Sequence, residues 1–173
     1  MLGLGLGIQS DAVHRVAILE SRARERGASR TMEHSEELKD LTLRFYKASA
    51  TGDLSFFDRH LSRQEGAQFI GTDSNEWLEA LEALREAART HSEAIEGGGL
   101  QIVGGQLQAY SEGNVGWVID RNASFRLPDS RQIPFRNTGM FRREDGEWKL
   151  VHGHTSIGVR SEELFGEDAT ASS

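Results

Sequence analysis

The residues most able to do chemistry lie in a stretch of alternating polar and apolar residues, 114–158. Arg121 shares the alternation of Trp117 and Ile119, which predicts that its guanidinium projects among apolar side chains. Burying a cation in that position costs free energy unless an acidic group pairs with it. Arg121 therefore indicates capture of an anionic ligand, or else a structural ion pair or a side chain whose head reaches water at a cavity mouth.

Asp73 is a second candidate, because a carboxylate that points into a cavity could act as a general base. The run Asp73-Ser74-Asn75-Glu76 also has the spacing of a helix capping box, with Asp73 at the cap. The cap explains Asp73 without any catalysis, so both interpretations stay open.

His152 and His154 are two residues apart, on one face of a predicted strand, and Asp120 has matching parity on another strand. Such a set could share a metal ion, but three converging ligands do not follow from the pattern. We expect sheet packing or an interface at these histidines, and neither a metal site nor a cofactor.

These residues depend on three long strand-like segments, 114–125, 133–144 and 147–158. Turn signals at Pro128-Asp129 and Asp145-Gly146 favour antiparallel hairpins between them. The odd positions form the more apolar set and are predicted to face an interior. The predicted ligand pocket consists of Phe69, Trp77, Trp117, Ile119, Arg121, Phe135, Asn137, Phe141 and Thr155. The predicted outer face, suited to a dimer interface, carries Asp120, Arg136, Met140, His152 and His154.

Helices are predicted before this meander. Ser35 should cap a helix whose apolar stripe contains Leu38, Leu41, Phe45 and Ala48 and which ends at residues 51–53. A short helix follows from Leu54, then a strand over 67–71, and a longer helix opened by Asp73 with Trp77 on its stripe. Residues 100–110 predict a strand broken at Gly104-Gly105. The order indicates an α+β fold in which a curved antiparallel sheet packs against helices.

Composition limits the classes of protein. The chain has 173 residues, no cysteine and a net charge of -7, which argues against disulfides and against a general nucleic-acid binder. No apolar run approaches the length of a membrane span, so we expect a soluble, cytoplasmic protein that does not act at a membrane. We predict one domain over 32–159, an N-terminal extension over 1–31 as a short helix or flexible arm, and a flexible tail over 160–173.

The segment Asp145 to Ser156, with its W-x-x-V-H-x-H-x-S strand, resembles the SnoaL-like branch of the NTF2-like superfamily. The same strand is similar to the association domain of calcium/calmodulin-dependent kinase II. The resemblance implies a cone-shaped cavity between sheet and helices, and commonly a dimer formed through the outer sheet face. Of the cavity arginines in the association-domain branch, one matches Arg121, and the other positions hold Gly139 and Thr155. The tyrosine that donates to an oxyanion in the ketosteroid-isomerase branch matches Phe45, with Tyr46 beside it.

We therefore expect a homodimer that binds a polar or acidic small organic molecule. The alternative is a cofactor-independent cyclase, isomerase or dehydratase, in which Asp73 moves a proton while Arg121, Asn137 or Tyr46 stabilises an oxyanion.

Overall fold

The computed structural model describes residues 31–79, 81–95, 101–160 and 162–163. The elements in chain order are β1 (Glu33–His34), α2 (Glu36–Thr51), α3 (Leu54–His60), β2 (Gln68–Ile70), β3 (Trp77–Leu78), α4 (Leu81–Ile95), β4 (Gln101–Val103), β5 (Gln106–Glu112), β6 (Val115–Arg126), β7 (Gln132–Glu144) and β8 (Glu147–Ser156). The predicted N-terminal extension lies almost wholly outside the described residues, as does most of the predicted tail. No helix in the described part of the chain is long and apolar enough to span a membrane.

The first helix forms as predicted. The Ser35 side chain accepts from the Leu38 N–H at 3.3 Å, and acidic residues occupy the first turn of α2. The helix ends at Gly52, which adopts the left-handed conformation with φ of 64°. Asp53 then caps α3 by accepting from the Phe56 N–H at 3.2 Å. The buried side of α2 contains the four predicted positions, Leu38, Leu41, Phe45 and Ala48.

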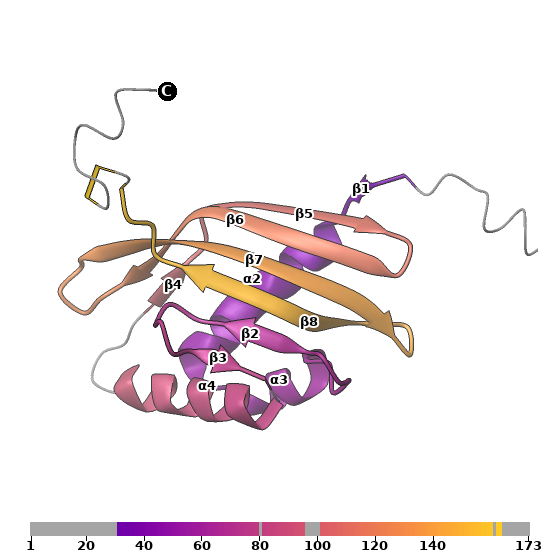
Figure 1. Cartoon of the computed structure of the whole chain (residues 1–173), viewed down its shortest axis with the longest axis horizontal. Helices are drawn as coiled ribbons and strands as arrows, with labels where there is room; N and C mark the ends of the chain where they lie inside the picture. Colours follow the sequence, from indigo (N-terminus) through magenta and orange to yellow (C-terminus); the bar gives the residue numbers. More distant parts are fainter. Residues whose placement is uncertain (1–30, 80, 96–100, 161, 164–173) are drawn as a thin grey trace, which may run out of the picture. The chain divides into compact units, whose positions relative to one another are not determined.

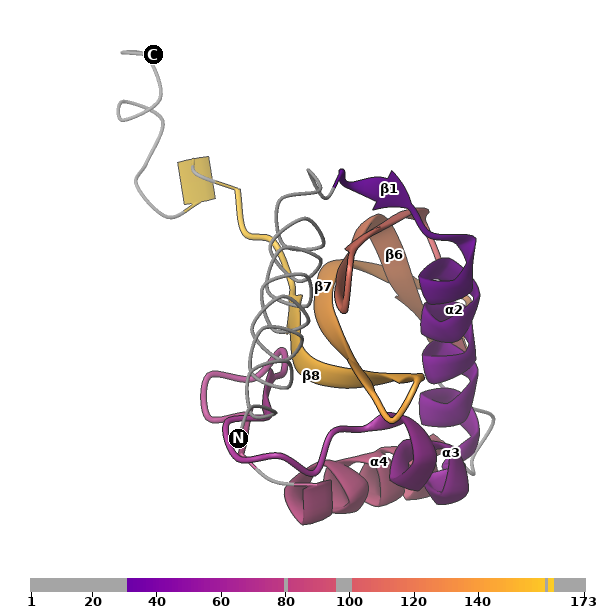
Figure 2. The ribbon, with the colours of Figure 1, turned by 90° about the vertical axis from the view of Figure 1, so that its right-hand side faces the viewer.

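The described strands form one curved sheet in the order β1-β5-β6-β7-β8-β2-β3, with β4 also paired to β6. Figure 1 shows α2 crossing the back of this sheet, with α3 and α4 beside its β2–β3 end. In Figure 2 the strands curve toward the side on which helices α2, α3 and α4 lie. The predicted α+β class is confirmed.

One strand pair departs from the antiparallel prediction, because β2 runs parallel to β8 with Phe69 opposite Gly153. A hairpin turn forces two strands to be antiparallel, and β2 has no such connection to β8. Its direction is set instead by the route of the chain from α3, and the sheet is therefore mixed.

The turn between β7 and β8 is the predicted two-residue hairpin. Glu144 pairs with Glu147, and the intervening Asp145 and Gly146 have φ values of 51° and 84°. Positive φ at both loop residues is the signature of a type I′ turn, whose twist matches that of the flanking strands.

Two bulges change which residues face inward. On β6, Asp120 pairs with Asn137 and Ala123 pairs with Phe135, so Arg121 and Asn122 stand opposite a single residue of β7. Asn122 accommodates the extra residue with φ of 64°. The buried positions of β6 are consequently even-numbered up to Asp120, and Ala123 is buried beyond the bulge.

The second bulge lies in β8, where Met140 pairs with His152 while the next residue of β7, Phe141, pairs with Leu150. Val151 is the extra residue, and the alternation of β8 shifts there. The prediction of an odd-numbered interior is therefore correct along β7 and wrong for β6 before its bulge.

The helix predicted to begin at Asp73 begins later, at Leu81. Asp73 instead shapes the turn between β2 and β3, accepting from the Asn75 N–H at 2.9 Å while its own N–H donates to the Glu76 carboxylate at 3.3 Å. The bond from the Asp73 N–H to Glu76 is that of a capping box, but the Asp73 side chain accepts from Asn75 and not from Glu76, and a short strand follows. Trp77 pairs with Ile70 on that strand and is 60% exposed, which contradicts its predicted place on a buried helix stripe.

Candidate functional site

A cavity of about 230 Å³ lies between the inner face of the sheet and the helices. Most of its wall is apolar and comes from α2, α3, α4, the β2–β3 hairpin and strands β4, β6, β7 and β8. The large apolar lining residues are Phe45, Phe57, Leu61, Phe69, Ile70, Leu78, Leu84, Ile102, Val118, Phe125, Phe135, Phe141 and Leu150. A wall of this composition favours an apolar occupant.

Aromatic rings build one part of this wall. Phe45 of α2 contacts Phe57 and Phe141, with ring centroids 6.0 Å and 6.1 Å apart, and meets Phe56 edge-on at 4.9 Å. Such tilted and edge arrangements suit the ring quadrupoles and hold each ring in place. Packed aromatic rings therefore form the wall where α2 and α3 meet the sheet.

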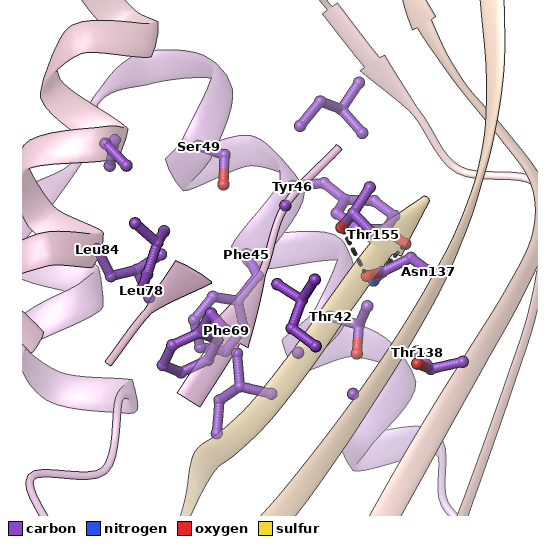
Figure 3. Close-up of a pocket in the computed structure, with 18 of the residues that line it drawn as sticks. Thr42, Phe45, Tyr46, Ser49, Phe69, Leu78, Leu84, Asn137, Thr138 and Thr155 are labelled. Carbon is purple, nitrogen blue, oxygen red and sulfur yellow. Dashed lines mark hydrogen bonds between the residues drawn. The ribbon is translucent and has the colours of Figure 1, made fainter. Parts of the chain in front are cut away.

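A polar group interrupts the apolar wall. Tyr46 of α2, Asn137 of β7 and Thr155 of β8 all line the cavity and are hydrogen-bonded in sequence. The Asn137 amide donates to the Tyr46 hydroxyl at 3.1 Å, and the Thr155 hydroxyl donates to the Asn137 carbonyl oxygen at 3.1 Å. Figure 3 shows these three side chains turned toward one another, away from Leu78 and Leu84.

Asp120 lies behind this group and is only 1% exposed. Its carboxylate accepts from the Tyr46 hydroxyl at 3.0 Å and from the Gly105 N–H at 3.2 Å. Gly105 can approach this closely because it lacks a Cβ, which would lie 2.3 Å from the Arg121 carbonyl oxygen. Asp120, Asn137 and Thr155 are direct cross-strand neighbours, so the sheet itself aligns them.

Burial changes the acidity of both buried groups. It is the main cause that raises the pKa of Asp120, while the hydrogen bonds from Gly105 and Tyr46 act in the opposite direction. Burial also raises the pKa of Tyr46, and the negative charge of Asp120 adds to that increase. The Tyr46 hydroxyl consequently remains protonated and serves as a hydrogen-bonding group.

The structure brings five of the predicted pocket residues to the cavity and leaves four outside it. Those that line it are Phe69, Phe135, Asn137, Phe141 and Thr155. Trp77, Trp117, Ile119 and Arg121 lie outside its lining. The β6 bulge explains the misplaced residues of that strand, because it turns the even positions inward.

Arg121 is the most consequential of these corrections. Its side chain is exposed, and its guanidinium donates to the Gln108 side-chain oxygen on the neighbouring strand at 3.5 Å. In the part of the chain that the structure describes, no lysine or arginine lines the cavity. The prediction that Arg121 projects into the cavity is therefore wrong.

The candidate base Asp73 is also outside the cavity, on an exposed turn. Among the described residues, Glu76 is the carboxylate that lines the cavity, and its side chain packs over Gly71. Glu76 is part of the capping-box pattern in the sequence. At the short strand β3, Glu76 and Leu78 turn inward and Trp77 turns outward. The helical pattern of residues 77–88 hides this alternation in the sequence.

Asp120 is likewise misplaced by the sequence, which put it on the outer face with Arg136, Met140, His152 and His154. The other four are at least partly exposed, and Met140 and His152 lie in one cross-strand row with Trp117 and Tyr110. Tyr110 and Trp117 stack with ring centroids 5.9 Å apart. Within the described residues, no group of three His, Asp or Glu side chains is arranged to hold a metal ion.

Comparisons with solved structures agree on the fold. An NTF2-like protein of unknown function from Pseudomonas putida matches 73% of this chain and 88% of its own, at 17% identity and a TM-score of 0.63. An NTF2-like protein with a cystatin-like fold from Novosphingobium aromaticivorans matches 92% of this chain and 97% of its own, at 15% identity and a TM-score of 0.60. A third, from Cytophaga hutchinsonii, matches 70% and 95% at 16% identity, with a TM-score of 0.54.

A search of curated proteins finds no match. The family model of the SnoaL-like domain matches residues 38–160, which is most of the chain and includes every element from α2 to β8 except the first two residues of α2. The predicted resemblance is confirmed, and this family supports a small-molecule-binding or isomerase-type domain. The chain belongs to the SnoaL-like domain family and has the NTF2-like fold.

Proposed function

We propose that this protein binds a small, largely apolar, neutral organic molecule carrying one polar group, in the cavity between its sheet and helices. The observation that carries the proposal is the combination of a mostly aromatic and aliphatic wall with a hydrogen-bonded polar group, Tyr46-Asn137-Thr155. Apolar area supplies most of the affinity in such a site, and a few placed polar groups orient the ligand.

The sequence predicted a polar or acidic ligand on the strength of Arg121. With that side chain outside, the described lining offers Glu76 as its charged group besides neutral hydrogen-bonding side chains. A carboxylate ligand would meet a second carboxylate and no cation, which is unfavourable in an apolar cavity. A neutral ligand fits the lining better.

Phenylnaphthylamine, a neutral dye whose fluorescence rises in apolar surroundings, tests the proposal. We expect saturable enhancement with the wild-type protein and a loss of affinity of about tenfold or more in Ala87→Phe, which fills the cavity from α4. Ala83→Phe, one turn earlier on α4 and outside the lining, is the matched control and should bind like the wild type. Equal binding by all three proteins would show that the dye does not use the cavity and would refute the proposal.

We also propose that two copies associate through the outer sheet face. Its support is the cross-strand row Tyr110, Trp117, Met140 and His152, in which Met140 is 46% exposed. Apolar and aromatic side chains in a continuous row suit the centre of an interface.

Light scattering after size-exclusion chromatography tests the association. We expect a dimer mass for the wild type and a monomer for Met140→Glu, which places a charge in the middle of the row. Leu43→Glu is the control, since Leu43 is similarly exposed at 44% but lies on α2. A monomeric wild type would contradict this part of the proposal.

A second function, proton transfer within the same cavity, is favoured by one observation. Glu76 and Asn137 both line the cavity, and a carboxylate and an amide with one unused hydrogen are a usable base and hydrogen-bond donor. Exchange of the α-hydrogens of a bicyclic ketone such as tetralone for deuterium, followed by NMR in heavy water, tests it. Catalysed exchange that Glu76→Gln abolishes would favour an enzyme, whereas exchange at the rate of buffer alone would exclude this reaction.

A further inference from the structure

The hydrogen bonds at the polar end of the cavity run in one direction. The Thr155 hydroxyl donates to Asn137, the Asn137 amide donates to Tyr46, and the Tyr46 hydroxyl donates to Asp120. This donor chain, as we name these four residues, ends on a carboxylate that also receives the Gly105 N–H. Both partners of Asp120 present hydrogens to it, as an ionised carboxylate requires.

Asp120 determines the direction of the whole donor chain. A tyrosine hydroxyl has one hydrogen, and Tyr46 commits it to Asp120. The group of Asn137 that faces Tyr46 must then be its NH₂, because an amide oxygen there would oppose the hydroxyl lone pairs. The Asn137 oxygen is thereby turned toward Thr155, whose own single hydrogen is used on it.

The direction has a consequence for the cavity. Along the donor chain, every hydroxyl hydrogen is committed toward Asp120, and the oxygen of Thr155, at the open end, keeps lone pairs that can accept. Asn137 retains one amide hydrogen that can donate. Other hydroxyl residues line the cavity as well. The Thr42 hydroxyl donates to the Leu38 carbonyl oxygen at 2.8 Å, whereas a hydroxyl that can rotate, at Ser49, Thr72 or Thr138, donates or accepts equally and so does not select.

We infer that the ligand's polar group is a hydrogen-bond donor, such as the hydroxyl of a neutral apolar alcohol or phenol, and that Thr155 is the residue that receives it. The inference rests on the proposed binding function and specifies its ligand class. A ligand hydroxyl can donate to Thr155 and accept from Asn137 at once. An ether or ketone can only accept, and it finds no hydroxyl hydrogen along the donor chain.

Isomeric probes separate these classes. Naphthylmethanol and methoxynaphthalene have the same atoms, but only the alcohol can donate, and methyl naphthyl ketone is a second acceptor-only probe. Each is titrated against bound phenylnaphthylamine. We expect the alcohol to compete about five- to tenfold more strongly than the ether or the ketone, the value of one net hydrogen bond.

Two variants locate the preference. In Thr155→Val, which keeps the side-chain shape and removes the acceptor, the alcohol and ether should compete equally while both still bind. Ser156→Ala, the neighbouring hydroxyl residue outside the cavity lining, should keep the preference of the wild type. In Asp120→Asn, the new amide can donate to Tyr46 and release one hydroxyl hydrogen of the donor chain. The affinity of the ketone should therefore rise relative to that of the alcohol. Circular dichroism establishes that each variant is folded, and Thr155→Val decides the matter if Asp120→Asn does not fold.

The outcomes are distinct. If the dye is displaced but the ketone or ether competes as well as the alcohol in the wild type, the direction of recognition is wrong and the binding function stands. An alcohol preference that survives in Thr155→Val would also overturn the inference. If the dye does not bind the wild-type cavity at all, the proposed function fails, and this inference fails with it.

Discussion

Asp120 and Arg121 are neighbours on β6, yet their charges are held in opposite ways. The carboxylate on the inner face is 1% exposed and accepts hydrogen bonds from a tyrosine and from a backbone N–H. The guanidinium on the outer face is exposed and has one long contact with Gln108. The buried charge, that of Asp120, has hydrogen-bond partners within the protein, whereas the exposed charge of Arg121 is solvated by water. The two faces of the sheet should therefore respond very differently to equivalent substitutions.

The largest contrast is expected between adjacent residues of β7. Phe141, 1% exposed, packs against Phe45, so Phe141→Ala should lower the free energy of unfolding by about 3–5 kcal/mol. Met140→Ala, on the outer face, should change it by about 1 kcal/mol or less. Urea unfolding of both variants, at a concentration where the association state is known, measures the difference. Similar losses would mean that the outer face is as tightly packed as the inner one.

The next comparison is between the two charged neighbours, Asp120 and Arg121. Asp120→Ala leaves the Tyr46 hydroxyl and the Gly105 N–H without their acceptor and should destabilise the protein by about 1–3 kcal/mol. Arg121→Ala should stay within about 0.5 kcal/mol of the wild type. The same urea unfolding assay measures both variants. A large loss of stability in Arg121→Ala would contradict the prediction and show that its side chain stabilises the fold.

The two tyrosines of the chain give a smaller, closely matched contrast. Tyr46→Phe removes a hydroxyl that donates to Asp120 and accepts from Asn137, and we expect a loss of about 1 kcal/mol. Tyr110→Phe, on β5, keeps the ring that stacks on Trp117 and should be close to neutral. Thermal melts of the two variants would refute the contrast if the order were reversed.

The smallest expected effect is on the pH dependence of stability, and it concerns a histidine on helix α3. His60 of α3 lies 4.5 Å from the Phe56 ring, and burial, followed by the charge of Arg44, lowers its pKa. A histidine with a lowered folded-state pKa stabilises the fold fully above its ordinary pKa of about 6.5, and this contribution declines as pH falls from there toward the folded-state value. His60→Phe should therefore lose less stability than the wild type between neutral pH and pH values of about 5. Above pH values of about 8 the difference between the two proteins should be constant, and a difference that keeps changing there would point to another group.

Much of the fold was predictable because its signals are local. The Ser35 cap, the stripe on α2 and the Asp145-Gly146 turn each depend on a few consecutive residues, and all three predictions are confirmed. The later helix was placed too early because residues 77 and 81 fit one helical stripe, although Trp77 belongs to an edge strand. A two-residue strand is too short to show its period of two.

The site was only partly predictable, because its polar residues are joined across strands by a register that the sequence does not contain. The prediction places Asn137 and Thr155 on the interior correctly, since β7 alternates regularly and Thr155 lies beyond the Val151 bulge of β8. Asp120 was not, because without a bulge Arg121 would stand opposite Asn137.

Packing at the start of β6 explains why the bulged arrangement is adopted. In the unbulged ladder, Trp117 would take the inward place that Gly116 now occupies. Even a Cβ at Gly116 would lie 2.2 Å from the Leu38 side chain, so an indole has no room there.

The extra residue at Arg121-Asn122 thus has an effect out of proportion to its size. The same twelve residues of β6 can alternate in two ways, one presenting an acid to Asn137 and the other a base. The one extra residue of the bulge, without any change of side chain, determines whether a negative or a positive charge lies behind the polar end of the cavity. The position of an irregularity along a strand can in this way decide which charge lies behind a binding site, provided that the neighbouring layer has room for the side chains that it turns inward.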